Sequence, residues 1–78
     1  MENTFEVTDI HLATTLKCLG FEYLRLQAKE KNRKAFVFTE KEDRRTNINN
    51  YYNRKTLVDA LTYKGHFEML KDELFSQK

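Results

Sequence analysis

The sequence has no proline, no tryptophan, two glycines and one cysteine among 78 residues. Because glycine and proline are the strongest breakers of regular structure, their scarcity predicts long elements and few loops. A single cysteine excludes an internal disulfide and a zinc site built from several cysteines. We interpret Cys18 as a buried structural thiol, and an intermolecular disulfide or a reactive thiol remains the alternative.

Long apolar runs and targeting signals are also absent. No stretch approaches the roughly 18 apolar residues of a membrane span, and residues 1–20 lack the basic start and apolar run of a signal peptide. We therefore expect a cytoplasmic protein without a membrane partner. The length suits one domain over residues 1–78, with frayed ends at 1–4 and 76–78.

The side chains that carry catalysis are few. His11 and His66 are the two histidines, and neither belongs to a metal-binding motif such as HExxH. No glycine-rich phosphate loop or GxSxG motif occurs. The adjacent acids are interpreted as capping or solvated groups. We expect no enzyme, no cofactor and no metal.

Charge is unevenly spread along the chain, although the net charge is only +2. Residues 29–55 hold nine basic residues and four acids, whereas the rest of the chain holds five bases and eight acids. The middle of the chain is therefore a basic segment between acidic flanks.

The segment "FEVTDIHLATTLKCLGF" predicts a helix with signals at both ends. We expect Thr8 to be the N-cap, followed by Asp9 at the positive end of the helix dipole. Val7 and Leu12 fit a hydrophobic staple. Gly20 fits the left-handed residue that ends a helix.

Two strands are predicted next. In "FEYLRLQA" apolar and polar residues alternate, and "AFVFT" places Phe36 and Phe38 on one face and Val37 on the other. The polar turn "KEKNRK" joins them into an antiparallel hairpin. A hairpin alone is unstable in water, so it must pack on helices. A short extended piece is expected at residues 5–7.

Thr39 and Glu42 match a capping box, which predicts a second helix from Glu40. Its apolar stripe is thin. From the spacing to Ile48 we expect Tyr52 to face the core and Tyr51 to be exposed. We expect fraying at 49–53, because asparagine is a poor helix former.

The segment "TLVDALTYKGHFEMLKDELF" predicts a third helix, capped by Asp59 or Thr56. Its apolar seam steps by three and four residues: Ala60, Tyr63, Phe67, Leu70 and Leu74. Gly65 is expected to allow close approach of another element. The fold class is α+β: a helix, a two-stranded antiparallel hairpin and two further helices, with the hairpin packed on the helices.

These motifs together resemble a family of short phage and prokaryotic proteins described as a domain of unknown function, number 5659. The matching residues are Thr8, Asp9, Leu12, Ala13, Gly20, Phe21, Phe36, Val37, Phe38, Tyr52, Asn53, Val58, Asp59, Ala60, Leu70 and Lys71. The resemblance implies a stand-alone protein in a phage, plasmid or chromosomal setting. It implies no particular activity.

Nucleic-acid binding is the function that we favour from the sequence. Phosphate contacts need basic side chains on one face, and single strands also stack on exposed aromatics. The hypothesis joins the hairpin tip and the second helix into one basic face. The candidate residues are Lys31, Arg33, Lys34, Arg44, Arg45, Tyr51, Arg54 and Lys55.

Two alternatives remain open. The basic residues can simply be a solvated surface, with part of the charge neutralised by neighbouring acids. A protein-binding inhibitor or adaptor is the competing function, for example a phage anti-defence protein acting on a host protein. A homodimer through the third helix is a further possibility.

Overall fold

The computed structural model describes residues 3–76. The elements are β1 (Thr4–Val7), α1 (Ile10–Cys18), β2 (Tyr23–Ala28), β3 (Lys34–Thr39), α2 (Arg44–Tyr52) and α3 (Ala60–Ser76), with a single 3-10 turn, η1 (Glu30–Asn32), between β2 and β3. The α+β class is confirmed. The predicted hairpin is part of a three-stranded antiparallel sheet in the order β1-β3-β2. The extended piece expected at residues 5–7 belongs to β1.

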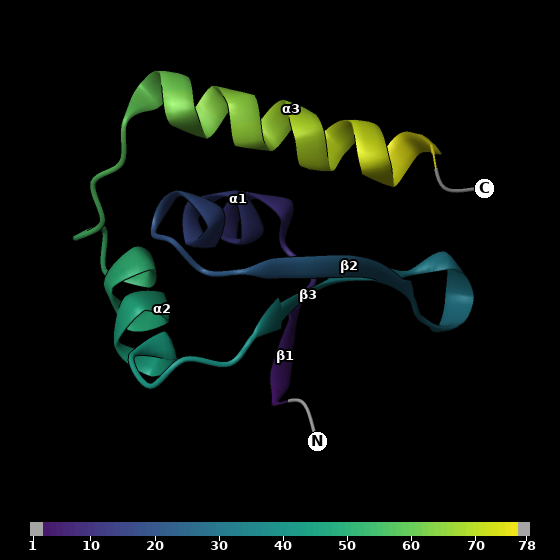
Figure 1. The fold of residues 1–78 in the computed structure, drawn as a ribbon, viewed down its shortest axis with the longest axis horizontal. Helices are drawn as coiled ribbons and strands as arrows, with labels where there is room; N and C mark the ends of the chain where they lie inside the picture. The colour runs from purple at the N-terminus through teal and green to yellow at the C-terminus, as the bar shows by residue number, and fades with distance from the viewer. Residues whose placement is uncertain (1–2, 77–78) are drawn as a thin grey trace.

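The molecule is layered, as Figure 1 shows: α1 lies over the sheet, α3 crosses on the outer side of α1, and α2 stands at one end. α1 is consequently covered on both sides. Its residues 12–16 are all buried, including Thr14 and Thr15. Those two hydroxyls donate to the carbonyls of Ile10 and His11, at 2.7 and 3.0 Å. Because their hydrogen bonds are satisfied within the helix, the two polar residues can be buried at little cost.

The core lies between α1 and the inner face of the sheet. Phe36 and Phe38 of the central strand are buried there with Leu16, and Phe5 stacks on Phe38. On the opposite face Val37 exposes only 1% of its surface, although no helix lies over it. Its paired neighbours are Glu6 and Arg25, whose long side chains point to the same face of the sheet.

The start of α1 differs slightly from the prediction, and its end agrees with it. Asp9, not Thr8, is the N-cap, and its carboxylate accepts a hydrogen bond from the His11 amide at 2.9 Å. Gly20 is left-handed, with φ +95°. The Gly20 amide donates to the Lys17 carbonyl and the Phe21 amide to the Leu16 carbonyl, at 3.1 and 3.0 Å. These two bonds form a Schellman motif, which confirms the predicted stop.

The predicted capping box before α2 is wrong. Thr39 is the last residue of β3, and its hydroxyl donates to Glu22 at 2.8 Å. The Glu40 amide donates to the Asn3 carbonyl at 2.9 Å, so the chain still follows β1 where the helix was expected to begin. α2 starts at Arg44 instead.

α3 follows the prediction more closely. Asp59 caps it, since its carboxylate accepts hydrogen bonds from the amide and hydroxyl of Thr62 at 2.9 and 3.0 Å. These bonds lower the pKa of Asp59. Leu70 is fully buried, as the seam predicts, but Ala60 is exposed. Gly65 is exposed and has no neighbour within 4 Å of a built Cβ, so the expected close approach does not occur within the molecule.

The fraying predicted at residues 1–4 and 76–78 stays a prediction. Thr4 pairs with Thr39 in the sheet, and Ser76 is the last residue of α3. Residues 1, 2, 77 and 78 lie outside the described part. Over residues 3–76 no helix combines the length and apolar character needed to cross a membrane.

Candidate binding surfaces

The hairpin tip carries three of the predicted contact residues: Lys31, Arg33 and Lys34. The tip is closed by a hydrogen bond from the Lys29 amide to the Arg33 carbonyl at 2.6 Å, and Lys31 takes a left-handed conformation with φ 57°. Lys29 is ion-paired with Glu6 at 2.7 Å. Lys34 lies near the end of α3, where its Nζ is 3.5 Å from the Leu74 carbonyl. Of the three predicted contact residues at the tip, Lys31 and Arg33 are exposed and Lys34 is half-buried.

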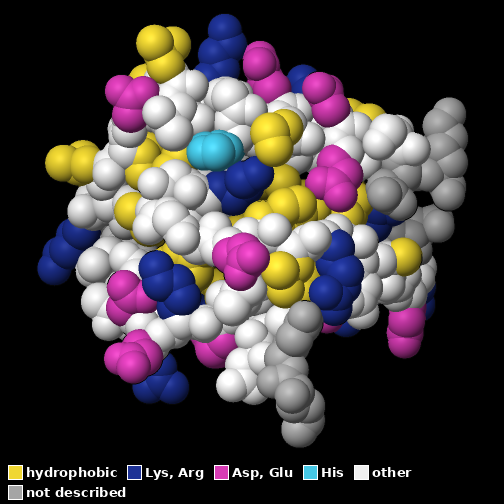
Figure 2. All heavy atoms as spheres, viewed as in Figure 1, with side chains coloured by type: hydrophobic (Ala, Val, Ile, Leu, Met, Phe, Trp, Pro, Cys, Tyr) yellow, Lys and Arg dark blue, Asp and Glu magenta, His cyan; other side chains and the backbone are white. Residues whose placement is uncertain are grey.

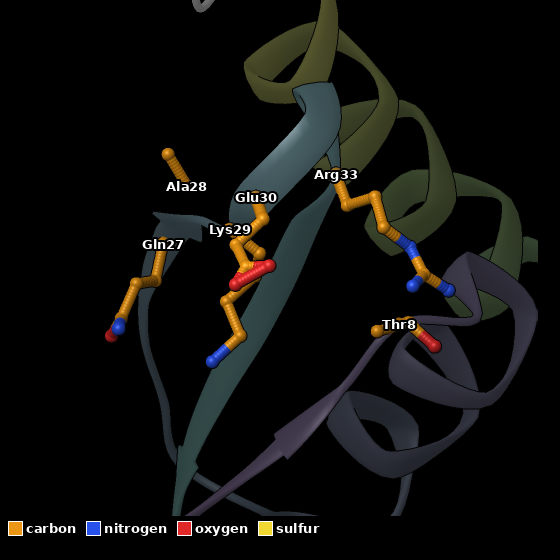
Figure 3. Close-up of a pocket in the computed structure, with 6 residues that line it drawn as sticks. All are labelled: Thr8, Gln27, Ala28, Lys29, Glu30 and Arg33. Carbon is orange, nitrogen blue, oxygen red and sulfur yellow. The ribbon is translucent and has the colours of Figure 1, made fainter.

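An open hollow of about 500 Å³ lies beside the tip. Figure 3 shows the Arg33 side chain reaching toward Thr8, with Gln27, Lys29 and Glu30 on the other side of the hollow. A second hollow of about 430 Å³ shares Thr8 and is lined mainly by apolar residues of α1, β3 and α3. Basic and acidic side chains both line the first hollow, so its charge favours neither an anionic nor a cationic ligand.

Arg44, at the start of α2, is held within the fold. Its Nε donates to Glu40 at 2.6 Å, and its guanidinium lies 4.8 Å from the centre of the Phe5 ring. The hydrogen bond to Glu40 raises the pKa of Arg44, while the same contact lowers that of Glu40. An arginine fixed by a carboxylate and a ring is poorly available to a phosphate or a partner protein.

The predicted roles of the two adjacent tyrosines are reversed. Tyr51 packs against the core beside Ile48, whereas Tyr52 is 63% exposed. Burial raises the pKa of the Tyr51 hydroxyl, with a further contribution from Asp9. The face of α2 that meets the core thus follows the three-residue spacing from Ile48 to Tyr51, not the four-residue spacing to Tyr52. Ile48 faces inward as predicted.

Arg45, Arg54 and Lys55 are all exposed. None of them makes an ion pair with another residue in the range 3–76. Arg54 ends α2 in a left-handed conformation, φ 62°, where glycine is usual. The Arg54 amide donates to the Tyr51 carbonyl at 3.1 Å and the Lys55 amide to the Asn50 carbonyl at 2.9 Å. This second Schellman motif fixes where the chain leaves the helix.

The two basic groups do not form one face. In Figure 1 the hairpin tip and α2 lie at opposite ends of the molecule, along its longest axis. That axis measures 35 Å. The single basic face expected from the sequence is thus two separate groups, one of Lys31, Arg33 and Lys34 and one of Arg45, Arg54 and Lys55.

Exposed apolar side chains near the α2 group were missed by the sequence reasoning. Leu57, in the connector between α2 and α3, is 91% exposed, and Tyr52 at the end of α2 is close to it in the chain. Figure 2 shows yellow hydrophobic side chains and a basic side chain along this edge of the molecule. Leu57 lies three residues before Ala60 and so continues the three-and-four stepping of the α3 seam, which means that its spacing alone gave no signal of exposure. We call Tyr52, Arg54, Lys55 and Leu57 the connector surface.

The groups with catalytic potential have structural partners. The His11 Nδ1 and the Tyr63 hydroxyl share a hydrogen bond of 2.9 Å, and the His11 ring stacks on Phe67. Cys18 is half-buried, and burial raises the pKa of its thiol, which disfavours the reactive thiolate. Within residues 3–76 no three histidine, cysteine or acidic side chains are placed to hold a metal ion.

A family model described as "Domain of unknown function (DUF5659)" matches residues 2–76. The chain belongs to this family. No curated protein and no solved structure matches it. The DUF5659 match spans every described element from β1 to α3. The tip, the connector surface and α3 are therefore all parts of the family domain itself.

Proposed function

We propose that this protein is a small non-enzymatic binding protein that holds a partner protein at the connector surface. The observation that carries the proposal is the exposure of Leu57, which leaves 91% of its surface in water. Burying a leucine side chain gains about 1.5–3 kcal/mol. Folding of the monomer does not gain this free energy, because Leu57 and Tyr52 stay exposed. Binding of a partner that covers both side chains gains it.

The composition of the connector surface supports the same proposal. Tyrosine and arginine are the residues most often found as strong contacts in protein interfaces. Here Tyr52 and Arg54 are two positions apart, and the second Schellman motif fixes the backbone between them. Arg54 and Lys55 lack acidic partners in residues 3–76, so an acidic rim on the partner complements them.

The biological setting of the proposal is an inhibitor or adaptor of phage or mobile-element type that acts on a host protein. The family resemblance motivates this setting. Genes for defence or anti-defence proteins beside the coding sequence favour it, and genes for replication proteins favour a nucleic-acid role.

Affinity capture with the tagged protein from a nuclease-treated host lysate tests the proposal. We expect one host protein in stoichiometric amount with the wild type, and its loss with Leu57→Asp. Met69→Asp is the matched control, because Met69 is also exposed but lies on α3, away from the connector. Equal capture by the wild type and Leu57→Asp, or no stoichiometric host protein, rejects the connector surface as the binding site.

Single-stranded nucleic acid is the second candidate. Three cations without ion pairs in residues 3–76, Arg45, Arg54 and Lys55, belong to α2 or directly follow it, and α2 ends at the exposed Tyr52. Base stacking on such a ring is worth about 1–3 kcal/mol. Three phosphate contacts on a single strand predict a salt dependence of log K near −2. Fluorescence anisotropy with labelled DNA and RNA strands at about 50 mM salt is the test, and absence of binding eliminates this candidate.

A further inference from the structure

α3 is longer than the helix that supports it. Its 17 residues extend about 25 Å, whereas the nine residues of α1 extend about 13 Å. Much of the side of α3 that faces away from α1 stays uncovered, as the upper edge of Figure 1 shows. Leu61 and Phe75 on this helix are 79% and 69% exposed.

The exposed residues of α3 include a stripe along one side. At about 100° per residue, Leu61, Lys64, Glu68, Asp72 and Phe75 lie within an arc of about 80°. All five are exposed. We call them the α3 stripe. Lys64, Glu68 and Asp72 make no ion pair with another residue of the described range 3–76.

The order of residues in the α3 stripe is self-complementary around Glu68. Leu61 lies seven positions before Glu68 and Phe75 seven after it, while Lys64 lies four before and Asp72 four after. We propose that α3 pairs with α3 of a second copy of this chain in an antiparallel two-fold dimer that crosses at Glu68. Each Leu61 then meets Phe75 of the other copy, and each Lys64 meets Asp72 of the other copy.

Charge complementarity selects a second copy in this orientation. An antiparallel pair of α3 helices forms two lysine–aspartate contacts. A parallel pair instead places Lys64 against Lys64 and Asp72 against Asp72. Gly65 lies one turn before the crossing point and has nothing within 4 Å of a built Cβ. It leaves room for a second backbone, which accounts for a glycine that costs about 1 kcal/mol inside a helix.

The dimer is a weak one. A single pair of helices buries less than the roughly 800 Å² per partner of standard interfaces. The two Glu68 carboxylates also meet near the two-fold axis and repel each other. We expect dissociation in the micromolar range or weaker, and tighter association when Glu68→Gln removes the repulsion.

Sedimentation equilibrium of the full chain over about 10 μM to 1 mM is the first test. The wild type is expected to shift from monomer to dimer in this range. Lys64→Asp and Asp72→Lys each replace two attractive contacts with two repulsive ones and weaken the dimer by on the order of 10- to 30-fold. Both positions are exposed, and circular dichroism verifies that the variants stay folded.

Sedimentation of an equimolar mixture of these two variants is the decisive experiment. Lys64→Asp carries acids at both positions and Asp72→Lys carries lysines at both. In the mixed pair both lysine–aspartate contacts join opposite charges, so an equimolar mixture is expected to dimerise at concentrations where each variant alone is mostly monomeric. Leu57→Asp, which removes the connector surface, leaves the dimer unchanged. A wild type that stays monomeric at 1 mM, a mixture that stays monomeric, or a dimer lost with Leu57→Asp overturns the proposal.

Discussion

Arg54→Gly is expected to stabilise the fold. Arg54 has φ 62° at the end of α2, a left-handed conformation that costs an L-residue about 1–2 kcal/mol. Glycine adopts this conformation without that cost, but it loses more backbone entropy on folding, by about 0.5–1 kcal/mol. The backbone hydrogen bonds of the Schellman motif are kept in the variant. The net expected gain is about 0.5–1 kcal/mol.

Thermal unfolding followed by circular dichroism measures this gain. A domain of 60–100 residues shifts by about 4–8 °C per kcal/mol, so Tm is expected to rise by about 2–8 °C. Arg54→Ala removes the same charge while keeping the left-handed conformation, and it should show no rise. An unchanged or lowered Tm for Arg54→Gly, relative to Arg54→Ala, refutes the argument from backbone strain.

The same two variants report on the role of the arginine. Residues that hold a strained conformation persist where function requires the side chain. If Arg54 contacts a partner, Arg54→Gly and Arg54→Ala lose binding to a similar extent, while Arg54→Gly alone gains stability. Binding that survives in both variants removes Arg54 from the connector surface.

Three further predictions concern the fold. Gly20→Ala places a Cβ at φ +95° and is expected to lower stability by about 1 kcal/mol or more in denaturant melts. Tyr51→Ala is expected to cost about 1–2 kcal/mol in the same assay because Tyr51 packs on the core, and Tyr52→Ala less than about 0.5; the opposite order contradicts the structure. Burial, and then the hydrogen bond to Glu73, raise the pKa of Tyr23 above 10 in the folded state. The stabilisation is therefore complete below pH 10 and is lost as pH rises above it, and Tyr23→Phe should make stability fall less between pH 9 and 11.

The ends of α1 and α3 were predictable because capping depends on a few adjacent residues. Gly20 and Asp59 have the roles that their local sequence indicates. The shift of the α1 cap from Thr8 to Asp9 is small, since both side chains can accept a hydrogen bond from a first-turn amide.

The start of α2 was not predictable from local signals. Thr39 and Glu42 match a capping box, but β3 continues through Thr39 because β1 pairs with it across more than thirty residues of chain. The reversal of Tyr51 and Tyr52 follows from the same limitation. Which side of a weakly amphipathic helix is buried depends on where its neighbours lie, and α2 contains one aliphatic residue to orient it.

The separation of the basic groups follows from the length of β3. Residues 31–34 and 44–55 are close in sequence, but the six residues of β3 carry the chain about 20 Å from the tip toward the other end. A count of charges along the chain cannot detect this displacement, because it depends on a strand that runs straight through the centre of the sheet. The hypothesis of one basic face failed at this step.

The hairpin tip and the connector surface each contain a basic residue in the left-handed conformation, and they differ in the residues around it. Lys31 and Arg54 are the two left-handed residues other than glycine in the described part of the chain, and each is basic. Near Lys31 the chain has the ion-paired Lys29 and the acid Glu30, and the exposed Phe75 of α3 lines a hollow together with Lys34. Near Arg54 it has Tyr52 and Leu57. Charge alone mainly steers association, whereas burial of apolar surface supplies affinity. We therefore expect the proposed partner to be held at the connector surface, where Leu57 is 91% exposed.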